Sequence, residues 1–174
     1  MNKVFLLIYK LLFKNFVNSD TKLIGPFFKK MRGICFNLYT HNKSKKINIQ
    51  KGASFSSDTI LGDYSGIGEN CLITRNVVIG KYVMMGPNVK IYSINHKFDD
   101  LSIPMCFQGF QNSKKVTIED DVWIGANVII LPGVTIGKGS VIGAGSVISK
   151  NVDEYSIMVG NPAVKVKSRG KQNV

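Results

Sequence analysis

Residues 118–153 read IEDDVW, IGANVI, ILPGVT, IGKGSV, IGAGSV and ISKNVD, six successive hexads that each open with isoleucine. An α-helix repeats its apolar residues every three or four positions and a two-sided strand every second position, so this spacing fits neither. The third and fourth places of the hexads collect Gly, Asn, Asp and Pro, which turn a chain at low cost. Each hexad is therefore predicted to form one short strand and one corner.

The fifth places of these hexads hold small residues, which suit buried positions near a corner: Val122, Val128, Val134, Ser140, Ser146 and Val152. A short repeat of fixed length indicates a solenoid. Three strands close a triangular coil, and coils stacked at the strand spacing of about 4.8 Å place isoleucine over isoleucine in the interior. We therefore expect an all-β fold, a parallel β-helix in which no coil buries its apolar face alone.

The same pattern begins earlier in the chain with less regular residues. Its hexads open with Ile49, Phe55, Leu61, Ile67, Ile73, Ile79, Met85 and Ile91. Their fifth places are also small, except in the last hexad: Ala53, Thr59, Ser65, Cys71, Val77, Val83 and Val89. The eight earlier and six later hexads, taken three to a coil, predict between four and five coils.

The hexad IYSINH at 91–96 departs from the pattern of a small residue at the fifth place, because Asn95 is polar there and His96 follows at the corner. Residues 97–117 carry no hexads, and the repeat resumes at Ile118. Solenoids accommodate insertions as loops on one face, often the binding face. We expect a protruding loop, whose apolar residues suggest contact with a neighbouring subunit. The pattern leaves open whether the loop replaces a whole side of a coil.

The 174-residue chain is 44% hydrophobic and carries a formal charge of +12, which predicts an acidic partner or surface. Residues 1–46 hold ten Lys or Arg and one acid, Asp20, and so contribute nine of the twelve net charges. No nucleic-acid-binding motif accompanies this charge, and the aromatic residues of this basic segment, which we call the head, lie in an apolar run. Nucleic acid is therefore ranked low as a partner.

Within this head, the run VFLLIYKLLFKNFV at residues 4–17 places Lys3, Lys10, Lys14 and Asn18 on one narrow side of a helix. The run is shorter than the roughly 18 apolar residues of a spanning helix and lacks a signal-peptide cleavage site, so a cytoplasmic location is expected. Two interpretations have equal weight: a helix lying in an anionic membrane surface, at the inner face of the cell membrane, or a helix packed on the β-helix. Gly25-Pro26 is expected to end it.

Three regions follow from these patterns. Residues 1–46 form the basic amphipathic head, residues 47–156 form the β-helix with its insertion at 97–117, and residues 157–174 form a C-terminal cap and basic tail. The cap is expected because the last coil of a solenoid otherwise exposes an open strand edge. Cys35, Cys71 and Cys106 have no metal-ligand spacing and are expected to be reduced thiols.

From Asn95 to Arg169 the chain carries the motifs NHKFDD, IPM, VWIGANVIILPGVTIGKGSVIGAGSVISKNV and GNPA. In these it resembles the left-handed β-helix hexapeptide-repeat acyltransferases, in the branch of polysaccharide O-acetyltransferases of capsule and colanic-acid-type pathways, alongside galactoside and maltose O-acetyltransferases. The resemblance covers residues 47–169, and the basic head is similar to the start of the colanic-acid-type members. It implies left-handed coils, acetyl-CoA as cosubstrate and a homotrimer.

The resemblance also implies roles for individual residues. His96, at the start of the loop, matches the general base. Acetyl-CoA is implied to lie in a groove between two subunits, at positions that match Ala126, Ala144, Ser149, Lys150 and Lys167. The chain departs from relatives that carry a basic residue directly after the NPA motif, since Val164 stands there and Lys165 follows. Asn95, Asp99 and Trp123 are expected at the acceptor site.

A neutral imidazole within hydrogen-bond reach of a hydroxyl can take its proton while the oxygen attacks a thioester carbonyl. By the resemblance, the backbone N–H of Ala126 would stabilise the developing oxyanion. Asp99 and Asp100 are the acids nearest to His96 in sequence, although solvated loop charges are the favoured interpretation for both. No G-x-S-x-G motif is present, and no covalent acyl-enzyme is expected.

The favoured function is acetyl transfer to a sugar hydroxyl of a surface polysaccharide or lipid-linked glycan precursor. The alternative keeps the reaction and uses a soluble acceptor: an amino sugar nucleotide, a free sugar or serine. A zinc enzyme with three histidine ligands is disfavoured, because the chain has two histidines and His41 lies outside the repeats. A non-catalytic scaffold would be favoured by a His96 that faces solvent without a cavity.

Overall fold

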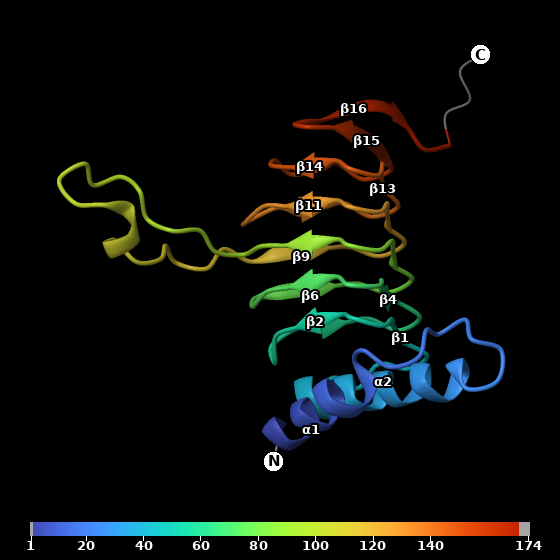
Figure 1. Ribbon diagram of the computed structural model, residues 1–174. Coiled ribbons are helices and arrows are strands. Elements are labelled where there is room, and N and C mark those ends of the chain that lie inside the picture. The colour runs from blue at the N-terminus through green and yellow to red at the C-terminus, as the bar shows by residue number, and fades with distance from the viewer. Residues whose placement is uncertain (1, 171–174) are drawn as a thin grey trace.

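Short strands, parallel in all pairs but one, stack along the three sides of a triangular column (Figure 1). The computed structural model describes residues 2–170. The first side contains β1 (Asn48–Ile49), β4 (Gly66–Ile67), β7 (Met84–Met85), β10 (Trp123–Ile124), β13 (Val141–Ile142) and β15 (Ser156–Gly160). The second contains β2 (Ser54–Phe55), β5 (Leu72–Ile73), β8 (Lys90–Ile91), β11 (Ile129–Ile130) and β14 (Val147–Ile148). The third contains β3 (Ile60–Leu61), β6 (Val77–Ile79), β9 (Val116–Ile118) and β12 (Thr135–Ile136).

We call the turn from the first to the second side the first corner, the turn from the second to the third side the second corner, and the return to the first side the third corner. The chain passes each corner once per coil. The third coil, for example, contains β7, β8 and β9.

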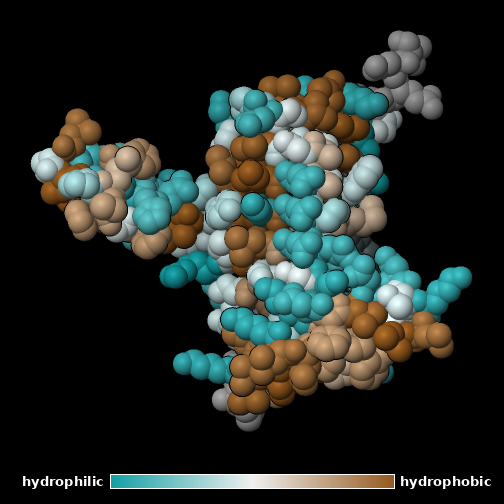
Figure 2. All heavy atoms as spheres, in the orientation of Figure 1, coloured by the Kyte–Doolittle hydropathy of each residue, from teal (hydrophilic) through white to brown (hydrophobic). Residues whose placement is uncertain are grey.

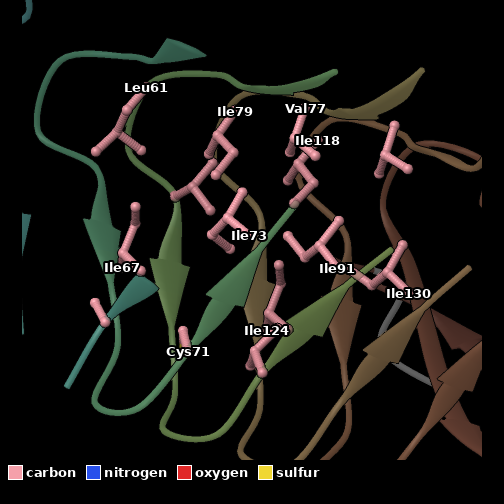
Figure 3. Close-up of a cluster of buried hydrophobic side chains, with 14 of the residues drawn as sticks. Leu61, Ile67, Cys71, Ile73, Val77, Ile79, Ile91, Ile118, Ile124 and Ile130 are labelled. Carbon is pink, nitrogen blue, oxygen red and sulfur yellow. The ribbon is translucent and has the colours of Figure 1, made fainter. Parts of the chain in front are cut away.

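The interior of the column is made by the residues that open the hexads, as predicted. Ile130 is paired with Ile91 on one neighbouring strand and with Ile148 on the other, and all three are buried. Figure 3 shows this apolar cluster, to which the small fifth-place residues such as Cys71 and Val77 contribute from the corners. Because each coil meets only its neighbours, stacking buries a continuous core.

The insertion leaves the column at the second corner and replaces no side. Strand β9 is paired with β6 and β12 on the third side, with Val116 beside Val77 and Ile118 beside Ile79. Val116 is fully buried, whereas Asn95 is exposed. The fifth place of the interrupted hexad is thus filled by Val116 after the insertion and not by Asn95 before it. β9 also begins at Val116, inside the range 97–117 predicted for the loop.

Two helical segments close the base of the column: α1 (Asn2–Ile8), which continues as a π-helix, η1 (Tyr9–Phe13), and α2 (Gly25–Thr40) (Figure 1). The prediction that Gly25-Pro26 ends the first helix is wrong. This pair starts α2, where a proline in the first turn is compatible with helix geometry because its missing N–H would have no partner there.

The helices supply hydrogen-bond donors to the open edge of the first coil. Along the column, neighbouring coils exchange hydrogen bonds in both directions, as Gln50 N donates to Ile67 O and Asn70 N donates to Lys51 O. The first coil has no coil beneath it to supply donors. The buried Arg32 of α2 donates from Nε to Ile49 O at 2.8 Å, and the Tyr9 hydroxyl donates to Ala53 O at 2.7 Å.

The opposite end is closed by a hairpin. β15 continues the first side in parallel with β13, and β16 (Ala163–Ser168) returns antiparallel to β15 after Gly160. This hairpin overlaps the segment 157–174, for which a cap was predicted. The last part of the predicted basic tail, residues 171–174, lies outside the described residues. Within residues 2–170, no helix is both long and apolar enough to cross a membrane.

Candidate functional site at the loop and corners

A short antiparallel stalk holds the loop on the column. The Lys114 N–H donates to Ser93 O at 2.7 Å, the Gln111 N–H donates to Asn95 O at 2.9 Å, and the Lys97 N–H donates to Gly109 O at 3.0 Å. Below the stalk, the buried Ser93 donates from its N–H to Thr74 Oγ1 of the second coil at 3.0 Å. The base of the loop is therefore tied to the rigid column.

His96 lies in this stalk, opposite Phe110. The two ring centroids are 4.2 Å apart at an interplanar angle of 33°, so the phenyl ring fixes one side of the imidazole. Among the described residues, neither imidazole nitrogen has a hydrogen-bond partner, and the side chain is exposed. Sequence reasoning placed Phe110 only among the apolar residues of the loop, because pairing across a loop of this length leaves no periodic signal.

Neither nearby acid reaches His96. Asp100 accepts from the N–H and the hydroxyl of Ser102, at 2.8 and 2.6 Å, and these hydrogen bonds hold its pKa below the ordinary value. Asp99 lines a hollow within the loop together with Lys97, Ile103 and Phe107, and His96 does not border that hollow. The imidazole is thus oriented by Phe110 and the stalk in a single chain, not by a carboxylate.

Ala126 and Ala144 lie at the first corner, in successive coils. The carbonyl of Ala126 accepts from the Gly145 N–H at 2.8 Å, whereas the Ala126 N–H donates no hydrogen bond within the described part of the chain. The coils approach closely here, since a Cβ built on Gly125 would lie 2.6 Å from Ala144 N. The first corner therefore offers an available backbone donor beside small side chains.

The remaining predicted residues occupy other parts of the column. Ser149 and Lys150 are exposed at the second corner, two coils beyond the loop, and the exposed Lys167 lies on β16. Trp123 projects outward from the first side, with 52% of its surface exposed. The exposed Asn95 belongs to the stalk beside His96.

One chain does not bring these residues together. His96 is at the second corner, whereas Ala126 and Ala144 are at the first, and a whole side of the column separates them, on the order of 15–20 Å at about 3.3 Å per residue. A ligand bound at the first corner would therefore lie a whole side away from the His96 of the same chain.

Two of the three thiols are buried. Burial raises the pKa of Cys71 to about 11, and burial also raises the pKa of Cys35, so both are protonated at neutral pH. Cys106 is exposed in the loop. Residues 2–170 contain no group of three or more His, Cys, Asp or Glu side chains arranged to hold a metal ion, and His41 is the C-cap of α2.

Comparison with known proteins agrees with this architecture. Residues 115–150 match the family model described as bacterial transferase hexapeptide (six repeats). A proposed acetyltransferase of Schizosaccharomyces pombe is 43% identical over 155 residues, which cover 86% of this chain and 73% of that protein. The chain therefore belongs to the family of hexapeptide-repeat transferases, and its column is a left-handed β-helix.

Two further proteins are informative. Galactoside O-acetyltransferase of Lactococcus lactis is 41% identical over 103 residues, 59% of this chain and 48% of that protein, so the chain spans about half the length of this relative. The crystal structure of an N-acyltransferase from Bacillus cereus, in complex with dTDP and coenzyme A, has a TM-score of 0.65 and 25% identity, and the match covers 74% of this chain and 73% of that one.

Proposed function

We propose that this protein is an acetyltransferase that uses acetyl-CoA and transfers the acetyl group to a hydroxyl of a sugar, in a surface polysaccharide or a lipid-linked glycan precursor. Membership of the transferase family and the similarity to a galactoside O-acetyltransferase support the reaction class. The observation that carries the proposal is the imidazole of His96, which is held by Phe110 at the loop base with both nitrogens free of hydrogen bonds among the described residues.

In this mechanism, His96 accepts the proton of the sugar hydroxyl while the hydroxyl oxygen attacks the carbonyl carbon of the thioester. The carbonyl oxygen becomes an oxyanion, which the free N–H of Ala126 stabilises. Collapse of the tetrahedral intermediate breaks the C–S bond, and the imidazolium returns the proton to the departing sulfur of coenzyme A. The products are the acetyl ester and free coenzyme A.

Each site is formed between two copies of the chain, and three copies form a homotrimer with three such sites. In a single chain His96 is exposed, and it does not line the loop hollow that Asp99 and Phe107 border. One chain alone thus fits the non-catalytic scaffold of the sequence analysis, and the proposal depends on a second copy that encloses the imidazole. An arrangement in which the second corner of one copy faces the first corner of the next brings His96 to Ala126 and Ala144. It also gives the apolar side chains of the loop, including Leu101 and Phe107, a surface to contact. Ring closure by three such contacts is a common solution for heterologous interfaces.

Within that groove, we assign acetyl-CoA to the Ala126 and Ala144 corner, with Ser149, Lys150 and Lys167 towards its nucleotide. The small side chains leave room for a pantetheine arm, and the lysines suit its phosphates. Val164 offers no charge at its place in the hairpin, so Lys165 and Lys167 of β16 remain for that contact. Asn95, Asp99 and Trp123 are assigned to the acceptor.

The favoured acceptor is a glycan near the cytoplasmic face of the membrane, because the head of the chain is strongly basic. A soluble acceptor is the second candidate. It is favoured by the structural similarity to an N-acyltransferase crystallised with dTDP, which is consistent with an amino sugar nucleotide. A free sugar or serine would require only a change in the acceptor pocket.

The direct test is coenzyme A release by the purified protein with acetyl-CoA and a panel of acceptors: host polysaccharide, lipid-linked glycan, nucleotide amino sugar, galactoside and serine. Mass spectrometry of the products locates the acetyl group on oxygen or nitrogen. Acetylation of oxygen on a glycan supports the proposal, acetylation of a nucleotide amino sugar supports the second candidate, and absence of release with every acceptor contradicts both.

A further inference from the structure

The base of the molecule carries a broad apolar surface that the fold does not cover (Figure 2). In α1 and η1, Tyr9 and Phe13 point into the core, whereas Leu7 and Leu11 lie on the other face and are 56% and 65% exposed. The first helix is therefore apolar on two faces. Packing on the β-helix uses only one of them.

The chain that follows extends the same surface. Exposed apolar residues continue through the connection and along α2: Phe16, Leu23, Ile24, Phe27, Ile34 and Leu38. Leu23 is 94% exposed, and a contiguous group of such exposed apolar residues marks an interaction surface. Together with Val4, Leu7, Leu11 and Leu12, these residues form what we call the base surface.

The charges around the base surface define what it contacts. Residues 1–46 contain nine lysines, Arg32 and the single acid Asp20. Arg32 is buried, Lys14 donates to Ser54 Oγ and Lys46 lies over the Tyr64 ring. The exposed Lys3, Lys10 and Lys22, which neighbour the exposed leucines in sequence, remain for an external partner. A second copy placed face to face would oppose lysine to lysine, which is unfavourable. An apolar face bordered by lysines fits an anionic lipid surface.

We propose that the base surface docks the protein on an anionic membrane, with the axis of the β-helix standing on the bilayer. The helices that cap the first coil thus act in two ways: their inner face completes the column, and their outer face inserts between lipid headgroups. Docking of this kind requires no spanning helix.

This orientation sets the height of the reacting group, an extension that rests on the proposed function. The loop with His96 leaves the third coil, two coil steps above the first. A helix layer about 10 Å thick and coil steps of about 4.8 Å place His96 about 20 Å above the headgroups. A membrane-anchored acceptor must reach that height, so we infer a lipid-linked glycan with several sugars and not a sugar attached directly to the lipid phosphate.

Vesicle co-sedimentation tests docking without any measurement of activity. Wild-type protein should bind vesicles of phosphatidylglycerol and phosphatidylcholine, bind less at high salt, and not bind phosphatidylcholine alone. Leu11→Asp and Leu23→Asp should each weaken binding about tenfold or more. The matched control is Val164→Asp, whose side chain is 60% exposed at the opposite end of the column and whose substitution should leave binding unchanged.

Absence of binding by the wild type would overturn docking, as would an equal loss in Val164→Asp. A reduced oligomer size in Leu11→Asp and Leu23→Asp, with vesicle binding retained, would assign the base surface to a second copy. For the height, lipid-linked oligosaccharide and monosaccharide are compared in vesicles and as water-soluble analogues. Equal acetylation of both in vesicles contradicts the 20 Å spacing estimated above. Failure of the soluble analogues as well contradicts the proposed function and leaves the docking result standing.

Discussion

Val116 lies beside Val77 on the third side of the column, although the whole insertion separates it from the hexad that it completes. Without an insertion, the hexad after Ile91 would open at residue 97, whereas it opens at Ile118, so 118 − 97 = 21 residues are inserted. Together with the bond from Lys114 N to Ser93 O, this assigns residues 94–114 to the insertion. The residues on either side join as IYS and KVT, a regular hexad.

Deletion of residues 94–114 should therefore leave a folded β-helix. Val116 would keep its place beside Val77, and Lys115 would supply the corner. Circular dichroism should show the strand signal of the wild type and a cooperative thermal transition, while acetyl transfer should be lost with His96. A deletion variant that is unfolded would show that the loop, and not the repeat, holds the third coil together.

His96→Ala should lower kcat by a factor of roughly 10² to 10⁴, because a positioned general base contributes about that much. The affinity for acetyl-CoA should remain, since the cofactor is assigned to the Ala126 and Ala144 corner and to the lysines and not to the imidazole. Asp100→Asn in the same loop is the matched control and should change kcat little, because Asp100 accepts its hydrogen bonds from Ser102 and does not contact His96. Retention of more than about a tenth of wild-type kcat in His96→Ala would assign the proton to another group.

Mixed oligomers test whether the site is shared between copies. His96→Ala and Ala144→Trp should each be inactive alone, the first without a base and the second with its cofactor corner filled. Random mixing in equal amounts should restore about a quarter of the sites, those that combine an intact His96 from one copy with an intact Ala144 from its neighbour. Activity that stays at the level of the single variants would place both residues in one chain.

Arg32→Met should lower the free energy of unfolding by about 3 kcal/mol, because the buried guanidinium donates to Ile49 O, Val17 O and Ser19 Oγ and the carbonyls would lose their partner. Arg169→Met is the matched control. Its ion pair with Asp121, at 2.8 Å, is about half exposed and should contribute less than about 1 kcal/mol. Denaturant titration compares the two, and equal losses would contradict the structural role of Arg32.

Cys71 should make stability fall at alkaline pH. Burial raises the pKa of its thiol to about 11 in the folded chain, above the ordinary value of about 8.5. Between these pH values the unfolded chain releases the proton while the folded chain retains it, so the free energy of unfolding decreases as pH rises. Cys71→Ala should have a shallower slope from pH about 8.5 to 11, where Cys35 and Tyr9, whose pKa values burial also raises, supply the rest, and should match the wild-type slope between about pH 6 and 8. Identical slopes at alkaline pH would show that the thiol ionises within the fold.

The strands were predictable because each hexad carries its own sequence pattern, an apolar first residue and a small fifth residue. The openers Ile118, Ile124 and Ile130 repeat at a fixed interval, and stacking of identical units converts that interval into structure without any long-range information. The insertion was predicted as a loop, but its limits were not. Asn95 is the fifth residue of its hexad in the sequence, whereas Val116 fills the fifth place of that hexad in the structure. Only the register of β9 shows that the loop leaves between two sides of a coil and does not replace a side.

The helical head shows a second limit. A helix apolar on two faces has the same composition whether it packs on the column or lies in a membrane, and the structure shows packing of one face with the other left exposed. α2 was not predicted, because a Gly-Pro pair is compatible both with the end of one helix and with the first turn of the next. For the candidate site, the residues named by sequence similarity stay a prediction, and their distribution over two corners could not be predicted because it depends on the position of each hexad within its coil.

Neither end of the column presents an open strand edge, and this determines how the column can be lengthened by design. A stack of parallel coils with open ends is a template for fibre growth, since another chain can add its strands in register. Here Arg32 and Tyr9 occupy carbonyls at one end, and β16 reverses the strand direction at the other. The column can therefore be lengthened by duplicating an internal coil, such as the one that contains β10, β11 and β12, without creating an end that polymerises.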